Sequence, residues 1–174
     1  MDDNSLLALA VQLGKLLKER GLKLALAESC TGGMASQYIT AIAGSSAWFE
    51  RAFITYSNQA KVEMLHVSAR TLANFGAVSE QTAHEMALGA LNNSGADITA
   101  SITGIAGPDG GTDDKPVGTV CFGFAAKNKQ QTQQTNPQVN AHTMRFTGSR
   151  DAIRKQSVTY TLETLITLTL SIDL

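Results

Sequence analysis

The sequence predicts a three-layer α/β/α domain with a mixed β-sheet, and three patterns lead to this prediction. Short apolar runs typical of buried strands alternate with segments whose apolar residues recur at helical spacing. Serine and glycine residues stand at the boundaries of these segments, where helix caps and turns are expected. The last strand-like runs are joined by a polar stretch, which indicates that the last strands are antiparallel. With 174 residues and 43% hydrophobic content, residues 1–174 are expected to form a single domain.

Apolar spacing and cap residues predict the individual elements. The first helix shows leucines at helical spacing before Gly21, and the second ends at Gly44, because glycine commonly follows the last helical turn. Ser57 and Ser79 are placed to cap two further helices. The predicted helices cover residues 6–20, 31–43, 57–65, 69–75 and 79–94, with a long final helix that begins at Ser149 or Asp151. The predicted strands cover residues 21–28, 51–56, 97–103, 117–126 and 142–146, and the Gln/Asn-rich residues 127–140 are expected to form a mobile hairpin connection.

The composition favours a protein that acts on a small molecule. The 14 Lys and Arg residues against 15 Asp and Glu residues give a net charge of -1, which provides no general basic surface for nucleic acid or anionic membranes. No apolar window reaches the roughly 18 residues that a membrane-spanning helix needs. With only Cys30 and Cys121, no paired cysteine spacing and no secretory segment, we expect a reduced, cytoplasmic protein. The last helix is apolar on more than one face, so a homo-oligomer is expected.

The candidate active site is the segment 28–33, with the sequence ESCTGG. It follows the apolar run 22–27 and precedes a helical pattern, so it is expected at a strand-to-helix turn. The first N–H groups of a helix have no intrahelical partner, and such a turn can place a nucleophile or an anion beside them. The candidate nucleophiles are Ser29, Cys30 and Thr31, while Gly32 and Gly33 allow a ligand to approach the backbone closely. The alternatives are that Ser29 and Thr31 only cap the helix and that Cys30 is a small core residue.

Lys61 is the candidate base, because a free serine hydroxyl is a poor nucleophile at neutral pH. If its helix begins near Ser57, Lys61 lies close to the first turn, where the helix dipole disfavours a cation by about 0.3–1 kcal/mol. To act near neutral pH its pKa must fall from about 10.4 to about 7–8, a cost of roughly 3–5 kcal/mol that requires burial as well as the dipole. Tyr56, at the preceding strand end, could relay a proton or orient the amine. The alternatives are a surface lysine and an ordinary half-buried tyrosine.

Other residues give weaker signals. None of the three histidines stands beside a glycine-rich turn, so a Ser-His-Asp triad is only weakly supported. The second glycine-rich turn, residues 103–111, offers backbone N–H groups to a phosphate or carboxylate, although it matches neither common phosphate-binding motif. Arg150 and Arg154 share one helix face and could clamp an anion. No spacing typical of metal ligands occurs in the sequence, so no metal is expected.

Several separate motifs, in order along the chain, resemble the CinA C-terminal-domain family. They are AESCTGG at 27–33, AGSS at 43–46, TYSN at 55–58 followed by Lys61, GAVS at 76–79, GIAGPDGG at 104–111 and KPVGTV at 115–120. The resemblance extends from about Leu6 to the last helix. Two features depart from the family pattern: Thr103 stands where serine is frequent, and the 127–140 tract differs most.

The resemblance implies an amidase that converts nicotinamide mononucleotide into nicotinate mononucleotide and ammonia in pyridine nucleotide salvage, without a metal or cofactor. It also implies that Ser29 is the nucleophile, that Lys61 is its base and that Tyr56 assists. The N–H groups of Cys30 and Thr31 are then expected to stabilise the oxyanion. The expected substrate contacts are Cys30, Thr31, Gly32, Gly33, Asn58, Thr103, Gly104, Gly107 and Arg150, with the ribose phosphate held by the 103–111 turn and Arg150. The alternatives are a non-catalytic nucleotide-binding or regulatory module and an amidase whose nucleophile is Cys30.

Overall fold

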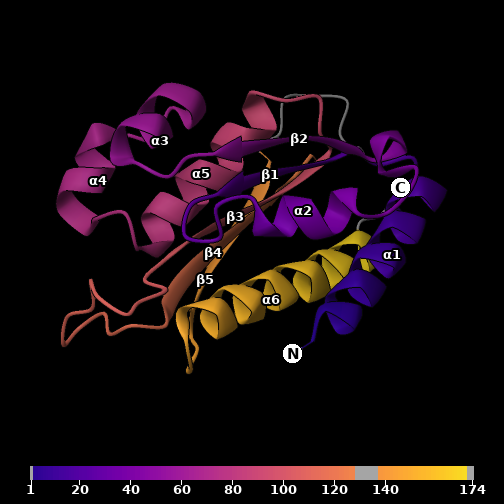
Figure 1. Ribbon diagram of the computed structural model, residues 1–174. Helices are drawn as coiled ribbons and strands as arrows, with labels where there is room; N and C mark the ends of the chain where they lie inside the picture. Colours follow the sequence, from indigo (N-terminus) through magenta and orange to yellow (C-terminus); the bar gives the residue numbers. More distant parts are fainter. Residues whose placement is uncertain (1, 128–136, 172–174) are drawn as a thin grey trace.

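A five-stranded sheet with helices on both faces forms the protein (Figure 1). The structure is a computed structural model and describes residues 2–127 and 137–171. The helices are α1 (Asp3–Glu19), α2 (Met34–Thr40), α3 (Asn58–Leu65), α4 (Ala69–Phe75), α5 (Glu80–Asn92) and α6 (Arg150–Ser171), with a short 3₁₀ helix, η1, at Ser45–Ala47. The strands are β1 (Leu24–Glu28), β2 (Phe49–Ile54), β3 (Ile98–Gly104), β4 (Thr119–Ala126) and β5 (Gln138–Arg145).

The strand order is β2-β1-β3-β4-β5, with β1 parallel to both β2 and β3 and with β4 and β5 added antiparallel. Helices α1, α2 and α6 cover one face of the sheet, and α5, with α3 and α4 beside it, covers the other (Figure 1). The predicted three-layer fold with a mixed sheet and antiparallel last strands is therefore confirmed. No helix in residues 2–127 or 137–171 is long and apolar enough to span a bilayer.

The two sheet faces are packed differently. Side chains alternate along a strand, so Leu24 and Leu26 of β1 join the large apolar cluster under α1, α2 and α6, while Ala27 points to the α5 side. On that second face, the buried hydroxyls of Thr99 and Ser101 donate to carbonyl oxygens of α5. These bonds satisfy polar groups that would otherwise be costly to bury, and they hold α5 close to the sheet.

Several predicted boundaries are wrong. Strand β1 begins at Leu24 and not at residue 21, and β2 covers Phe49–Ile54 and not 51–56. Helix α2 begins at Met34 and not at residue 31, because Gly32 and Gly33 adopt φ values of 56° and 95°, which an α-helix does not accept. It ends at Thr40, and Gly44 begins η1 instead of ending α2. Strand β5 begins at Gln138, so residues 138–140 pair with β4 and are not part of a connection. Residues 128–136 of the expected mobile connection lie outside the described residues.

Candidate active site

Ser29 lies at the carboxyl edge of the sheet, directly after β1. Strand β1 runs between the parallel strands β2 and β3, so three strand ends meet there. The Ser29 N–H donates to the carbonyl of Ile102 on β3 at 2.9 Å, which fixes its backbone to the sheet. In open α/β sheets, ligands bind at this edge, beyond the carboxyl ends of the strands.

Lys61 reaches Ser29 from α3. Ser57 caps α3, as predicted, and Lys61 is the fourth helical residue, with its side chain directed back to the strand ends. Its Nζ lies 3.0 Å from Oγ of Ser29 and 2.8 Å from the carbonyl oxygen of Thr55. The residue is only 1% exposed, and burial lowers the pKa of Lys61 below its ordinary value, although the nearby Cys30 thiol opposes this shift.

In the described part of the chain, no carboxylate forms an ion pair with Lys61. An unpaired buried amine favours its neutral form, whose lone pair can accept a proton from the Ser29 hydroxyl. The arrangement thus brings the candidate nucleophile and the candidate base into direct contact.

Tyr56 and Arg150 form the rim of the site. The backbone carbonyl of Tyr56 lies 3.5 Å from Lys61 Nζ, whereas its phenol hydroxyl accepts a hydrogen bond of 3.3 Å from Arg150. The same guanidinium donates to the carbonyl oxygen of Gly107 at 2.7 Å. Arg150 therefore ties the start of α6 to two loops around the site, and the Tyr56 hydroxyl bonds to Arg150 and not to Lys61.

A cavity of about 190 Å³ lies against Ser29 and Lys61. Its lining consists of Ser29, Cys30, Tyr56, Lys61, Ala77, Val78, Thr103, Gly104, Ala106 and Arg150. The structure thus brings together most residues that the sequence singled out, from five separate segments of the chain. Thr31, Gly32, Gly33, Asn58 and Gly107 do not line this cavity.

Cys30 borders the cavity but is not an activated thiol. Burial raises the pKa of Cys30 to about 12, and the Glu28 carboxylate adds to this effect, while the backbone N–H of Cys30, Arg154 and Lys61 oppose it. Because the thiolate is the reactive form of cysteine, this environment disfavours Cys30 as a nucleophile. Of the two candidate nucleophiles on the cavity wall, Ser29 is the one in contact with a base.

A protein-family model described as the CinA C-terminal domain matches residues 6–169. The chain belongs to this family. A relative named nicotinamide-nucleotide amidohydrolase PncC, from Enterobacter agglomerans, is 51% identical over 166 residues, which cover 95% of this chain and 96% of the relative. The protein of the same name from Escherichia coli K12 is 51% identical over 165 residues, covering 95% of each. The crystal structure of competence/damage inducible protein CihA from Agrobacterium tumefaciens is 44% identical, with a TM-score of 0.88, and the match covers 94% of this chain and 95% of that one.

Two charged residues of the CinA domain make contacts with the 28–36 segment that were not predicted from the sequence. Glu28 is fully buried and accepts hydrogen bonds from the start of α2. Arg154 donates to the carbonyl oxygen of Thr31 at 2.6 Å. The only sequence signal for Glu28 is an acidic residue at the end of an apolar run, and Arg154 was expected to bind an anion and not a backbone carbonyl.

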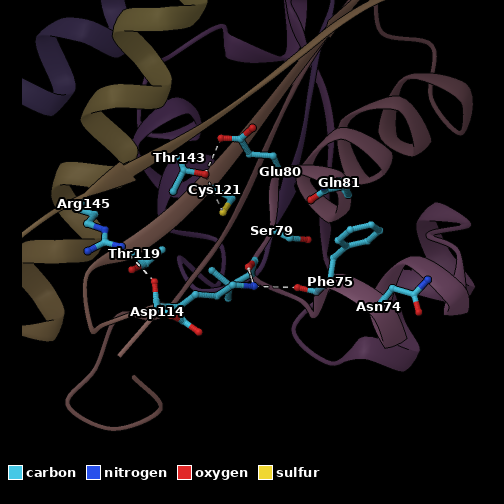
Figure 2. A pocket seen from close by; sticks show the side chains of 12 residues that line it. Asn74, Phe75, Ser79, Glu80, Gln81, Asp114, Thr119, Cys121, Thr143 and Arg145 are labelled. Carbon is cyan, nitrogen blue, oxygen red and sulfur yellow. Dashed lines mark hydrogen bonds between the residues drawn. The ribbon is translucent and has the colours of Figure 1, made fainter. Parts of the chain in front are cut away.

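A second cavity of the CinA domain, about 450 Å³, lies on the other side of Val78, which lines both. Figure 2 shows its wall, where Thr143 stands between Glu80 and Cys121 and hydrogen-bonds the Glu80 carboxylate. Lys115 donates to the carbonyl oxygens of Phe75 and Val78 at 2.9 and 2.7 Å. This lysine therefore holds the 75–78 segment, whose Val78 lines both cavities.

Proposed function

We propose that this chain hydrolyses the carboxamide of nicotinamide mononucleotide to nicotinate mononucleotide and ammonia. The 3.0 Å contact between the buried Lys61 amine and the Ser29 hydroxyl carries the proposal, because it supplies an activated nucleophile for acyl transfer. The substrate follows from the two relatives named nicotinamide-nucleotide amidohydrolase, which match nearly the whole chain at 51% identity.

The reaction begins when Oγ of Ser29 attacks the carboxamide carbon and its proton passes to Nζ of Lys61. The protonated Lys61 then gives this proton to the amide nitrogen, the C–N bond breaks, and ammonia leaves an acyl ester on Ser29. Lys61 next takes a proton from water, which attacks the ester carbon. Nicotinate mononucleotide leaves as the C–O bond to Ser29 breaks and the proton returns to Oγ.

The oxyanion of each tetrahedral intermediate is assigned to the N–H groups of Cys30 and Thr31. In the described residues, neither N–H donates to a backbone carbonyl, whereas the next two, of Gly32 and Gly33, are bonded within the turn. Losing one donor of this kind typically costs about 2.7–4 kcal/mol of transition-state stabilisation.

The cavity is large enough for only part of the proposed substrate. Drug-sized ligands usually occupy pockets of about 300–1,000 Å³, so a cavity of about 190 Å³ fits the nicotinamide ring and not the whole nucleotide. The ribose phosphate then extends past the rim, where Arg150 bonds the Gly107 carbonyl and keeps further N–H donors, while Thr103 and Gly104 line the cavity itself. We place the reaction in the cytoplasm, as a step of pyridine nucleotide salvage, where the free thiols Cys30 and Cys121 remain reduced.

An ammonia-release assay with nicotinamide mononucleotide, nicotinamide riboside and nicotinamide tests this function. The mononucleotide should be hydrolysed fastest, the riboside more slowly because it lacks the phosphate, and free nicotinamide least. Binding of the mononucleotide without ammonia release would instead identify a nucleotide-binding module. Equal hydrolysis of all three amides would remove the nucleotide from the proposal.

A further inference from the structure

Glu28, the last residue of β1, is a fully buried carboxylate directly before the nucleophile. Its Oε2 accepts from the N–H groups of Gly33 and Ala35 at 3.0 and 3.2 Å. Its Oε1 accepts from the N–H and the hydroxyl of Ser36 at 2.9 and 2.5 Å. Each carboxylate oxygen therefore has two donors, and no cation among the described residues forms an ion pair with it.

These four bonds close the turn that carries Ser29. The turn begins at Glu28 and ends at Gly33, so a bond from the Glu28 side chain to the Gly33 N–H joins its two ends. Inside this ring, Gly32 N–H donates to the Ser29 carbonyl at 3.0 Å. The Glu28 side chain and the β3 contact of Ser29 together leave the nucleophile little freedom to move.

In the first turn of α2, the N–H groups of Ala35 and Ser36 are consequently occupied by Glu28, and that of Met34 donates to the Thr31 carbonyl at 3.1 Å. The N–H groups at the start of a helix have no intrahelical acceptor, and the sequence suggested that a substrate anion might use them. In the structure their acceptor is part of the protein. This agrees with the proposed mechanism, which places the oxyanion earlier in the turn, at the N–H groups of Cys30 and Thr31.

We propose that Glu28 is a positioning residue for amide hydrolysis. Its carboxylate sets the 29–33 turn so that Ser29 Oγ meets Lys61 Nζ and the N–H groups of Cys30 and Thr31 stay uncommitted. The catalytic part of this inference rests on the proposed function, whereas the geometric part, the Ser29–Lys61 contact, does not.

A glutamine cannot replace this carboxylate, although it has nearly the same shape. One of its two terminal atoms is an NH₂ group, which cannot accept from the two N–H or O–H donors it would face. The Ser36 hydroxyl can turn and accept from an NH₂ group, but the backbone N–H groups cannot, so in either orientation at least one N–H loses its acceptor and the turn is expected to shift.

The test compares Glu28→Gln with Asp2→Asn. Asp2 is the matched control, because its carboxylate also accepts from the N–H and hydroxyl of a serine, Ser5, at the start of a helix, but it does not line the cavity. Both proteins are assayed with nicotinamide mononucleotide well below their melting temperatures. Glu28→Gln should lower kcat about 10²-fold with little change in KM, the size expected for a displaced reacting group, and Asp2→Asn should leave kcat unchanged.

A crystal structure of Glu28→Gln supplies a second readout that needs no activity. We expect the Ser29 Oγ to Lys61 Nζ distance to exceed hydrogen-bonding range. An unchanged kcat, or an unchanged 3.0 Å contact, overturns the proposal. If the wild-type chain releases no ammonia, the proposed function fails, while this distance still decides the role of Glu28. If Glu28→Gln does not fold, Glu28→Asp is measured in its place, with the same expectations.

Discussion

At the residue scale, the main feature is an amine kept away from water without a carboxylate partner. Among the described residues, the hydrogen-bond partners of Lys61 Nζ are the Ser29 hydroxyl and two backbone carbonyls. Carbonyl dipoles stabilise a cation less than a carboxylate does, so burial dominates and the pKa of Lys61 is lowered. A lysine in this state can accept a proton at a pH where a surface lysine is fully charged.

The lowered pKa of Lys61 predicts the pH dependence of the reaction. Because the neutral amine is the base, kcat/KM should rise with pH as Lys61 loses its proton, with a midpoint below the ordinary lysine value of about 10.4. A pH profile of kcat/KM measures this midpoint. A midpoint at the ordinary lysine value would contradict the assignment.

The same shift affects stability. The unfolded chain binds the Lys61 proton more tightly than the folded chain, so the free energy of unfolding should rise with pH between the folded pKa and about 10.4. Urea denaturation across this range should show a smaller rise for Lys61→Met, which lacks the titrating group. An equal rise in both proteins would argue against a lowered pKa.

At the element scale, the position of Lys61 depends on how closely α5 approaches α3. A Cβ atom on Gly89, in the last turn of α5, would lie 2.0 Å from the carbonyl oxygen of Leu65 at the end of α3. No side chain fits in this space. A glycine inside a helix costs about 1 kcal/mol of helix propensity relative to alanine, so its presence here is explained by the contact.

Gly89→Ala should therefore displace α3 and lower both stability and kcat, although alanine favours the helix. Overpacking of this kind typically costs about 1–3 kcal/mol, more than the propensity gain, and any shift of α3 also moves Lys61. Gly95→Ala is the control, because its Cβ would meet nothing closer than Glu50 Cγ at 4.0 Å. Melting temperature and ammonia release measure the two effects. Gly89→Ala behaving like Gly95→Ala would show that this contact is not needed.

The sequence predicts the elements better than their ends. Ser57 and Ser79 cap α3 and α5 as expected, because capping depends on a local side chain and the next few N–H groups. The start of α2 could not be predicted, because it depends on Gly32 and Gly33 adopting positive φ in a turn closed by Glu28. Such a turn is specified by a buried contact and leaves only a weak local pattern.

At the scale of the whole molecule, the sheet gathers residues that are distant in sequence. Arg150 and Tyr56 are 94 positions apart and meet because α6 begins beside the strand ends. Periodicity alone cannot place them together, and this contact was not predicted from the sequence. The parallel order of β2, β1 and β3, in contrast, agrees with the alternation of strand and helix patterns in the first half of the chain.

The expected homo-oligomer stays a prediction, but the structure leaves less exposed apolar surface on α6 than the sequence suggested. The sequence suggested it because α6 is apolar on more than one face. In the fold, Leu162, Leu165 and Ile166 are buried against the sheet and α1, and Leu170 remains 54% exposed near the end of the helix. Most of the apolar surface of α6 is thus used within the chain.

The central claim is that Ser29 attacks the amide with Lys61 as its base. Ammonia release from nicotinamide mononucleotide by Ser29→Ala, Cys30→Ala and Lys61→Ala tests it most directly, with circular dichroism to confirm that each variant is folded. We expect Ser29→Ala and Lys61→Ala to lose turnover by orders of magnitude, while Cys30→Ala retains it. Wild-type turnover in Ser29→Ala, together with its loss in Cys30→Ala, would contradict the account and identify the thiol as the nucleophile.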